Sequence, residues 1–368
     1  MRKEFHLLKN IYLSNTRGLD SIYKLLFAIT FKCNLKCKIC SIWKIPHRKE
    51  ISVGEIEQMF KKLTNLSWLD LTGGEITLRE DLVDIIGVII HNAKNLKIFH
   101  MTTNGMNPQR IIDATNEVVK RKLNPIVSVS IDGPQQIHDR LRGEKGSYVK
   151  IVETFKALKA LKKGRIYISS TISNFNYLYL DELIASLHND IPHFSLSDLH
   201  FNFFHVSPHY YGNEKLEGQG KDKIDFKLIK KYLDLTKKGN IIKKFLEANY
   251  VKYLEKYLHG EESPFVCQAM HGSVFVDPYG EVFPCLFYNR AIGKLHEHEY
   301  DINKLLKDPQ LNELKNQIEN KQCPHCWAPC EAYPTILGSL KTIFGKKQVS
   351  RAPLSVEGDN KVLQPAYS

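Results

Sequence analysis

Apolar runs and amphipathic stretches alternate along the first two thirds of the chain. Six apolar runs predict buried strands, because they are rich in aliphatic, β-branched and aromatic residues and end in polar loops. These runs are 24–30, 68–72, 96–103, 126–131, 165–172 and 199–206. Stretches with apolar residues at helical spacing separate them, and the first begins at Ser52 with Glu55 three residues later, which predicts a capping box. Six strand and helix units in a row predict an α/β fold, with a parallel sheet curled into a partial, TIM-like (β/α)6 barrel.

Polar motifs follow the ends of these strands, where barrels of this kind carry their active groups. The first strand is followed by Cys33, Cys37 and Cys40. Three thiolates can hold a cube of four irons and leave one iron open, whereas a closed zinc site wants four protein ligands. An open iron can chelate the amine and the carboxylate of S-adenosylmethionine. Three structural or zinc-bound cysteines are the alternative.

The Cys-x3-Cys-x2-Cys spacing resembles the radical S-adenosylmethionine (radical SAM) superfamily, in which a reduced [4Fe-4S] cluster cleaves the cofactor to a 5′-deoxyadenosyl radical. The resemblance implies further cofactor-binding residues. Gly73, Gly74 and Glu75 match the motif that holds the methionine amino group of the cofactor. Ser130 and Asp132 match a stretch that reaches ribose hydroxyls or the methionine carboxylate. A turn cap ahead of the next Gly-Pro pair is the alternative for Asp132.

Other polar residues near strand ends are candidate contacts to cofactor or substrate. They are Thr103 and Asn104 after the third strand, Ser170 on the fifth, and Asn202 and His205 along the sixth. If the polar face of the sixth strand points into the barrel, Asn202 and His205 contact adenine or substrate; an ordinary polar face is the alternative. The loop 205–213 is rich in rings and amides and is a candidate substrate site.

The remaining five cysteines predict a small C-terminal auxiliary-cluster domain. They are Cys267, Cys285, Cys323, Cys326 and Cys330. The Gly-x4-Cys element that ends at Cys285 resembles the auxiliary domains known as SPASM and twitch. Five thiols can ligate one auxiliary [4Fe-4S] cluster with one left over, but not two clusters with four ligands each, which favours the twitch type. Cys267 and Cys285 are expected to be ligands of this cluster, and two of the other three cysteines are expected to complete the set of four. Zinc is the alternative, since paired cysteines suit it equally well.

Composition indicates a globular protein that stays inside the cell. Hydrophobic residues make up 43% and charged residues 25% of 368 positions. No uncharged apolar run reaches the roughly 18 residues that span a bilayer, and the N-terminus lacks a signal pattern. We therefore expect a cytoplasmic protein, in which eight cysteines are metal ligands rather than disulfides.

Positive charge is concentrated in one segment. The net charge is +12, and residues 221–260 supply half of it, with eleven lysines against five acidic residues. Two helices are predicted here, from about 224, with a break at 238–240. The second, over 241–258, alternates apolar and aromatic residues with lysines, as in helices that lie on an anionic membrane surface. The alternative is a helix that covers the barrel with its lysines in water.

The chain is expected to divide into five parts. These are an N-terminal extension (1–22), a radical SAM partial barrel (23–215), a basic amphipathic helical region (216–262), an auxiliary Fe-S domain of SPASM or twitch type (263–335) and a basic tail (336–368). The extension is expected to pack under the barrel, with membrane contact as the alternative.

The predicted function is that of a radical SAM enzyme that abstracts hydrogen from an unactivated carbon. C–C bond formation or oxidation of a membrane lipid or a peptide would follow, with a reducing partner such as ferredoxin or flavodoxin. The alternatives are a peptide-maturing enzyme, an RNA methylase, a non-catalytic Fe-S electron carrier and a zinc-ribbon nucleic-acid binder. The sequence assigns no catalytic residue beyond the cluster ligands.

Overall fold

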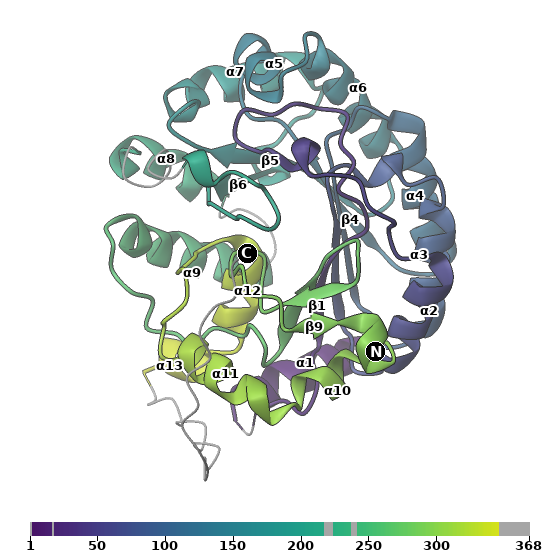
Figure 1. Ribbon diagram of the computed structural model, residues 1–368. Coiled ribbons are helices and arrows are strands. Elements are labelled where there is room, and N and C mark those ends of the chain that lie inside the picture. The colour runs from purple at the N-terminus through teal and green to yellow at the C-terminus, as the bar shows by residue number, and fades with distance from the viewer. Residues whose placement is uncertain (1, 17, 217–223, 237–240, 346–368) are drawn as a thin grey trace.

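The chain forms one curved sheet of nine strands in the computed structural model, which describes residues 2–16, 18–216, 224–236 and 241–345 (Figure 1). The strands are β1 (Lys24–Ala28), β2 (Trp68–Thr72), β3 (Ile98–Thr103), β4 (Pro125–Ser130), β5 (Arg165–Ile172), β6 (Leu199–Phe203), β7 (Ser273–Val276), β8 (Glu281–Phe283) and β9 (Gly293–Lys294). Their order across the sheet is β6-β5-β4-β3-β2-β1-β7-β8-β9. The first six strands are the predicted ones, and each is parallel to its neighbours among them, which confirms the partial α/β barrel.

Helices connect the strands and cover the outer face of the sheet. The helices up to β6 are α1 (Arg2–Ser14), α2 (Val53–Lys62), α3 (Leu82–Asn92), α4 (Pro108–Lys120), α5 (Gln135–Arg142), α6 (Ser147–Ala160) and α7 (Leu180–Asp190). Those after β6 are α8 (Phe226–Thr236), α9 (Ile241–Leu258), α10 (Ile302–Leu306), α11 (Asn312–Glu319), α12 (Pro329–Leu337) and α13 (Leu340–Ile343). Figure 1 shows α2, α3, α4 and α6 along the outside of the curved sheet. Because helices cover the outer face of the sheet, the outward positions of the parallel strands are mostly apolar.

Alternation along the strands separates an apolar outer face from a more polar inner face. Leu25 and Phe27 of β1, Leu69 of β2 and Phe99 of β3 are fully buried in the main core, beneath the helices. The alternate positions point into the barrel. They include Lys24, Asp70, His100, Ser128, Ser130, His200 and Asn202. The barrel interior is therefore polar enough to hold charged groups.

The C-terminal cysteine region continues the barrel sheet. β7 runs parallel to β1, with Leu26 opposite Phe275, and β8 and β9 follow as antiparallel strands. The sheet thus crosses the predicted domain boundary near residue 263, and that boundary stays a prediction.

α9 and α12 lie on the open side of the barrel, between β6 and β1 (Figure 1). The indole Nε1 of Trp327 donates to the carbonyl oxygen of Tyr250 at 2.8 Å, and the two rings stack. The aromatic stripe predicted on 241–258 thus packs inward: Tyr250 and Leu254 are fully buried, and Tyr253 packs against the core. The predicted break at 238–240 and the tail after 345 lie outside the described residues.

α1 packs beneath the barrel through polar contacts. His6 hydrogen-bonds the side chain of Asn65 at 2.8 Å, and the amide of Asn10 donates to the hydroxyl of Ser67 at 3.0 Å. The described residues include no helix with the length and apolar character needed to cross a membrane.

Candidate functional site

The loop after β1 brings three cysteines together at the mouth of the barrel. Burial raises the pKa of Cys33 to about 11 and that of Cys40 to about 12, and the charge of Cys37 adds to both shifts. Two nitrogen donors lie 4.0 Å from sulfur atoms: the amide of Asn104 from Cys33 Sγ, and the guanidinium of Arg142 from Cys37 Sγ. Hydrogen bonds to sulfur are a feature of thiolate-bound iron–sulfur clusters, so these residues fit such a group.

Among the described residues, no three His, Cys, Asp or Glu side chains are close enough to hold a single metal ion. The charges of Cys37 and Cys33 contribute to the raised pKa of Cys40. Because a metal displaces thiol protons, cluster assembly here has to overcome their raised pKa values.

Gly73 and Gly74 let the next loop lie directly on the cysteine loop. The backbone N–H of Gly74 donates to the carbonyl oxygen of Thr30 at 2.8 Å, and that of Glu75 to the carbonyl of Lys32 at 2.8 Å. A Cβ on Gly73 would lie 2.4 Å from the Thr30 oxygen. The two glycines therefore serve a close backbone approach.

The carboxylate of Glu75 is buried and is hydrogen-bonded on both oxygens. Oε1 accepts from the hydroxyls of Thr77, at 2.7 Å, and Thr103, at 2.8 Å, and Oε2 accepts from the backbone N–H of Asn104 at 2.6 Å. This arrangement joins the end of β2 to the end of β3 beside Cys33. Direct contact of Glu75 with a cofactor amine stays a prediction.

Asp132 ties the end of β4 to the cysteine loop. Its Oδ2 pairs with Arg142 at 2.7 Å, and its Oδ1 accepts from the backbone N–H of Thr171 at 2.9 Å. Arg142 in turn reaches Cys37. Arg142 belongs to the same family-like stretch of the sequence as Asp132, but the sequence analysis assigned no role to it.

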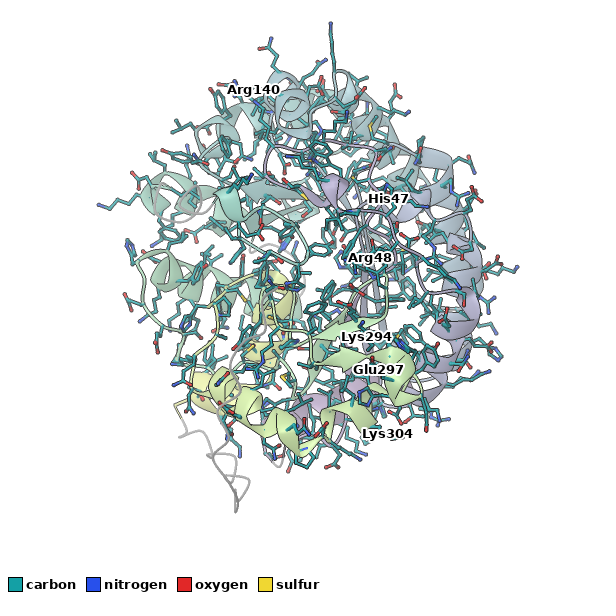
Figure 2. All side chains as sticks on the ribbon, in the orientation of Figure 1. His47, Arg48, Arg140, Lys294, Glu297 and Lys304 are labelled. Carbon is teal, nitrogen blue, oxygen red and sulfur yellow. The ribbon has the colours of Figure 1, made fainter. Side chains whose placement is uncertain are left out.

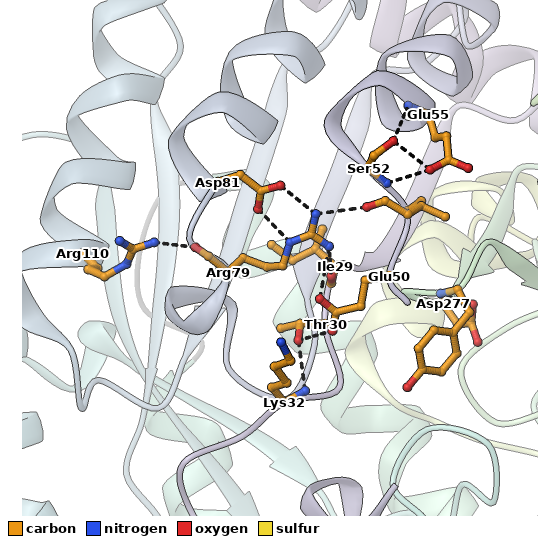
Figure 3. A network of polar contacts seen from close by, with 12 residues as sticks. Ile29, Thr30, Lys32, Glu50, Ser52, Glu55, Arg79, Asp81, Arg110 and Asp277 are labelled. Atoms are coloured by element: carbon orange, nitrogen blue, oxygen red, sulfur yellow. Dashed lines mark hydrogen bonds and ion pairs between the residues drawn. The ribbon is translucent and has the colours of Figure 1, made fainter. Parts of the chain in front are cut away.

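A second residue that the sequence analysis missed is Arg79, which fixes the base of the cysteine loop (Figure 3). Its guanidinium donates to the carbonyl oxygens of Ile29 at 2.8 Å and Ile51 at 3.0 Å, and forms a two-pronged pair with Asp81 at 2.8 and 2.9 Å. Glu50, 3.4 Å from Arg79, also accepts from the hydroxyl of Thr30 at 2.5 Å. The sequence signal that could have identified Arg79 is its charge and its position soon after the Gly-Gly-Glu motif.

The other predicted residues separate into two groups. Ser130 and Asn202 face the barrel interior, where the amide of Asn202 donates to the hydroxyl of Ser169 at 2.7 Å. Ser170 shares its face of β5 with Ile168 and Ile172, which belong to the helix-covered core. It is fully buried there and is not brought to the interior.

His205 lies past the end of β6, which is shorter than predicted. Its Nδ1 hydrogen-bonds the carbonyl oxygen of Phe203 at 2.8 Å, and its Nε2 accepts from the backbone N–H of Trp327 at 3.2 Å. Since Nδ1 carries the proton in this arrangement, the imidazole links β6 to the segment beside Cys326. Its predicted contact with adenine or substrate stays a prediction.

The loop 205–213 joins the two cysteine regions. On one side, the hydroxyl of Tyr210 donates to the carbonyl of Gly73 at 2.9 Å, and the amide of Asn213 donates to the carbonyl of Ile39 at 3.1 Å. On the other side, the hydroxyl of Ser207 donates to the carbonyl of Leu286 at 2.5 Å, next to Cys285. One loop therefore holds both groups in a fixed relation.

The turn between β7 and β8 also meets the first cysteine region. The hydroxyl of Tyr279 donates to the carbonyl of Pro46 at 3.0 Å, and its ring packs edge-on against Phe31 with the centroids 5.5 Å apart. Arg48 lies over the same ring at 5.3 Å. In the view of Figure 2, His47 and Arg48 lie above Lys294.

Cys326 lies among three other thiols of the second cysteine group. Burial raises the pKa of Cys326 well above its ordinary value, and the charges of Cys285, Cys267 and Cys330 add to the shift. Burial likewise raises the pKa of Cys267 to about 12. All eight cysteines of the chain are free thiols. A second thiolate-bound cluster fits this group.

Two family patterns match these two regions. The pattern of the Radical SAM superfamily matches residues 27–188, and that of the iron–sulfur cluster-binding SPASM domain matches residues 267–327. The chain carries a radical SAM domain and a SPASM domain. Together, the two matches support a [4Fe-4S] cluster with S-adenosylmethionine and an auxiliary iron–sulfur cluster as the cofactors.

Curated relatives are similar at low identity. The antilisterial bacteriocin subtilosin biosynthesis protein AlbA of Bacillus subtilis is 23% identical over 82% of this chain. A cysteine-type anaerobic sulfatase-maturating enzyme of Clostridium novyi is 25% identical over 85% of this chain and 88% of its own length. The chain spans 63% of AlbA and 38% of a second B. subtilis relative, the sporulation killing factor maturation protein SkfB.

Solved structures share the fold. Streptococcus suis SuiB bound to the precursor peptide SuiA overlaps with a TM-score of 0.57 at 17% identity, over 85% of this chain and 70% of SuiB. Native anSMEcpe with bound AdoMet overlaps with a TM-score of 0.53 at 19% identity, over 87% of this chain and 98% of that chain.

Proposed function

We propose that the protein is a radical SAM enzyme that oxidises or cross-links a peptide substrate with the help of its auxiliary cluster. The observation that carries this proposal is the loop 205–213, which is hydrogen-bonded to the Cys40 region and to the Cys285 region. An enzyme that only generated a radical would not need the two groups in one rigid frame.

When bound, the cofactors supply a 5′-deoxyadenosyl radical that removes one hydrogen atom from a substrate carbon, and an acceptor for the electron left after bond formation. The chain itself positions and shields these groups. Cys33, Cys37 and Cys40 hold the first cluster, while Asn104 and Arg142 direct N–H donors at its sulfurs. Ser130 and Asn202 line the interior where cofactor and substrate would meet.

We further propose Cys267, Cys285, Cys326 and Cys330 as the auxiliary-cluster ligands. Cys326 interacts with each of the other three through charge. Cys326 and Cys330 pack beside Cys285 against one apolar cluster, whereas Cys323 packs against the main core. Cys323 would then be the fifth, spare thiol.

A peptide is favoured over a lipid or RNA for two reasons. Relatives named for bacteriocin biosynthesis and sulfatase maturation suggest polypeptide substrates, and SuiB binds a precursor peptide. The aromatic part of the stripe on 241–258 that motivated a lipid is occupied by internal packing: Tyr250 stacks on Trp327, and Tyr257 stacks on His205. Ile241 and Ile242, at the start of the stripe, are exposed.

The substrate class is testable with reconstituted holoenzyme under anaerobic conditions. Separate reactions receive a synthetic random peptide library, anionic phospholipid vesicles or total RNA, with S-adenosylmethionine and dithionite. We expect only peptides to raise 5′-deoxyadenosine above the substrate-free rate, and the modified peptide to lose two hydrogen atoms. Stimulation by vesicles or RNA alone would overturn the peptide proposal.

We propose that the electron donor is a small acidic protein of the ferredoxin or flavodoxin type. The net charge of +12 favours association with an acidic partner. The free thiols are consistent with work in the reducing cytoplasm. Slower 5′-deoxyadenosine formation at high salt with such a donor, but not with dithionite, would support this; equal salt dependence would oppose it.

Membrane-surface contact is proposed through α1. Phe5, Leu8 and Tyr12 share its outer face and are 71%, 63% and 64% exposed, whereas its inner face packs through Asn10 and Ser14. Lys9, on the same outer side, could pair with anionic headgroups. Flotation with vesicles containing phosphatidylglycerol should carry the wild type but not Phe5→Ser/Leu8→Ser. Equal flotation of the two would contradict the contact.

A further inference from the structure

Lys24 is a fully buried lysine inside the barrel, at the start of β1. Lysine is rarely buried unless it is paired. Its Nζ lies 3.0 Å from Oδ2 of Asp70 and 4.9 Å from the centroid of the Trp68 ring. The same ammonium donates a hydrogen bond to the backbone carbonyl of Cys330. A fixed positive charge therefore contacts a residue of the auxiliary-cluster group directly.

Asp70 is held in place by two further donors, so the pair is rigid. The indole Nε1 of Trp68 donates to Oδ1 at 3.0 Å, and Nδ1 of His100 contacts the same oxygen at 3.0 Å. The other ring nitrogen of His100 hydrogen-bonds the hydroxyl of Ser128 at 2.8 Å. Although burial opposes ionisation of Asp70, Lys24 and His100 keep its pKa below the ordinary range.

The start of α12 is anchored to two neighbouring strands. Glu331, next to Cys330, accepts a hydrogen bond from the hydroxyl of Ser273 at 2.8 Å. Ser273 lies opposite Lys24 in the β1–β7 pairing. Lys24 of β1 thus holds the backbone at Cys330, and Ser273 of β7 holds the side chain of Glu331.

We propose that Lys24 is a positioning residue of the auxiliary cluster that orients Cys330 and raises the reduction potential of the cluster. The inference rests on the proposed assignment of Cys330 as a ligand. Reduction adds negative charge to a cluster, and a nearby buried positive charge stabilises that reduced state. Asp70 reduces this stabilisation of the reduced cluster, because its negative charge is paired with the Lys24 ammonium.

The test is a redox titration of the auxiliary cluster, followed by electron paramagnetic resonance, on full-length protein with both clusters reconstituted. The Cys33→Ala/Cys37→Ala/Cys40→Ala variant identifies the auxiliary signal. Lys24→Met should lower the potential, because it removes the positive charge and leaves Asp70 unpaired. Lys24→Met/Asp70→Asn should recover part of the loss and stay below the wild type, because Lys24 is the member of the pair in contact with Cys330.

Lys243→Met is the matched control, because Lys243, although only half-buried, also donates to a backbone carbonyl, that of Ser197 at 2.8 Å. Its potential should equal that of the wild type. An unchanged potential in Lys24→Met, or a double variant no higher than Lys24→Met, would overturn the inference. If Lys24→Met does not fold, the double variant decides, because it leaves no unpaired carboxylate at position 70.

The proposed function can be tested separately from the role of Lys24. Full-length protein that never binds more than four irons per chain would overturn the role of Lys24 through Cys330. Formation of 5′-deoxyadenosine by the same preparation would still support the radical chemistry.

Discussion

Gly74 passes so close to Lys32 that a Cβ at position 74 would lie 2.3 Å from the carbonyl oxygen of Lys32. The loop that carries the Gly-Gly-Glu motif and the loop that carries the cysteines are thus in backbone contact. Two hydrogen bonds of 2.8 Å, from the N–H groups of Gly74 and Glu75, close this contact. Cluster binding and the Gly-Gly-Glu motif are therefore coupled through the main chain.

Gly74→Ala is expected to displace the cysteine loop and reduce iron loading of the first cluster several-fold. The added methyl group meets backbone atoms of Lys32 and Phe31, which cannot rotate away. Gly54→Ala is the matched control, since Gly54 lies in α2 with no atom within 4 Å of a new Cβ. It should keep full iron content and gain up to about 1 kcal/mol of stability. Equal iron content in the two variants would contradict the coupling.

Arg79→Met is expected to lower the free energy of unfolding by roughly 3–5 kcal/mol, because breaking a buried ion pair leaves charge unpaired. It also frees the carbonyls of Ile29 and Ile51, so the first cluster should be lost more readily in air. Denaturant unfolding and the decay of visible absorbance measure the two effects.

The control is Arg121→Met, at the C-terminal end of α4. Arg121 forms an ion pair with Glu117 at 2.5 Å near the surface, and such pairs contribute about 0–1 kcal/mol. A loss in Arg79→Met no larger than in the control would show that the network in Figure 3 does not hold the cysteine loop.

Asp277, in the turn after β7, predicts a pH dependence of stability. Burial raises its pKa from 3.8 to about 7, while N–H donors from Glu281 and Tyr279 oppose the shift. The folded state therefore binds more protons than the unfolded state between these values, and stability falls as pH rises through this range. Asp277→Asn should flatten the fall in melting temperature between about pH 4 and about pH 7. Exposed Asp113→Asn should keep the wild-type slope; an equal slope in Asp277→Asn would contradict the assignment.

The sequence predicted the elements whose signals are local. β2 and β5 have the predicted bounds, because each is a compact apolar run between polar turns. The predicted capping box is present, with Ser52 N–H donating to Glu55 at 2.9 Å. The polar ends of the strands also meet at one edge, as parallel pairing requires.

The rest depended on contacts between distant segments. Pairing of β7 with β1 joins residues about 250 positions apart, which no local pattern reveals. Ser170 was selected for its residue type, but its position between Ile168 and Ile172 turns it toward the core. Arg79 acts on carbonyls that only the folded chain brings together.

Single cysteine variants test the proposed auxiliary ligands. Cys323→Ala should retain about eight irons per chain, whereas Cys326→Ala should fall toward about four, because one four-iron cluster loses a ligand. Iron and sulfide analysis after anaerobic reconstitution measures the difference. Loss of the auxiliary cluster in Cys323→Ala with retention in Cys326→Ala would show that Cys323, and not Cys326, is a ligand.

Formation of 5′-deoxyadenosine tests the central claim most directly. Anaerobically reconstituted protein is given dithionite and S-adenosylmethionine, beside the Cys33→Ala/Cys37→Ala/Cys40→Ala variant, which retains the five cysteines of the second group. The account predicts product from the wild type and none from the variant. Fully iron-loaded wild-type protein that forms no 5′-deoxyadenosine would contradict it.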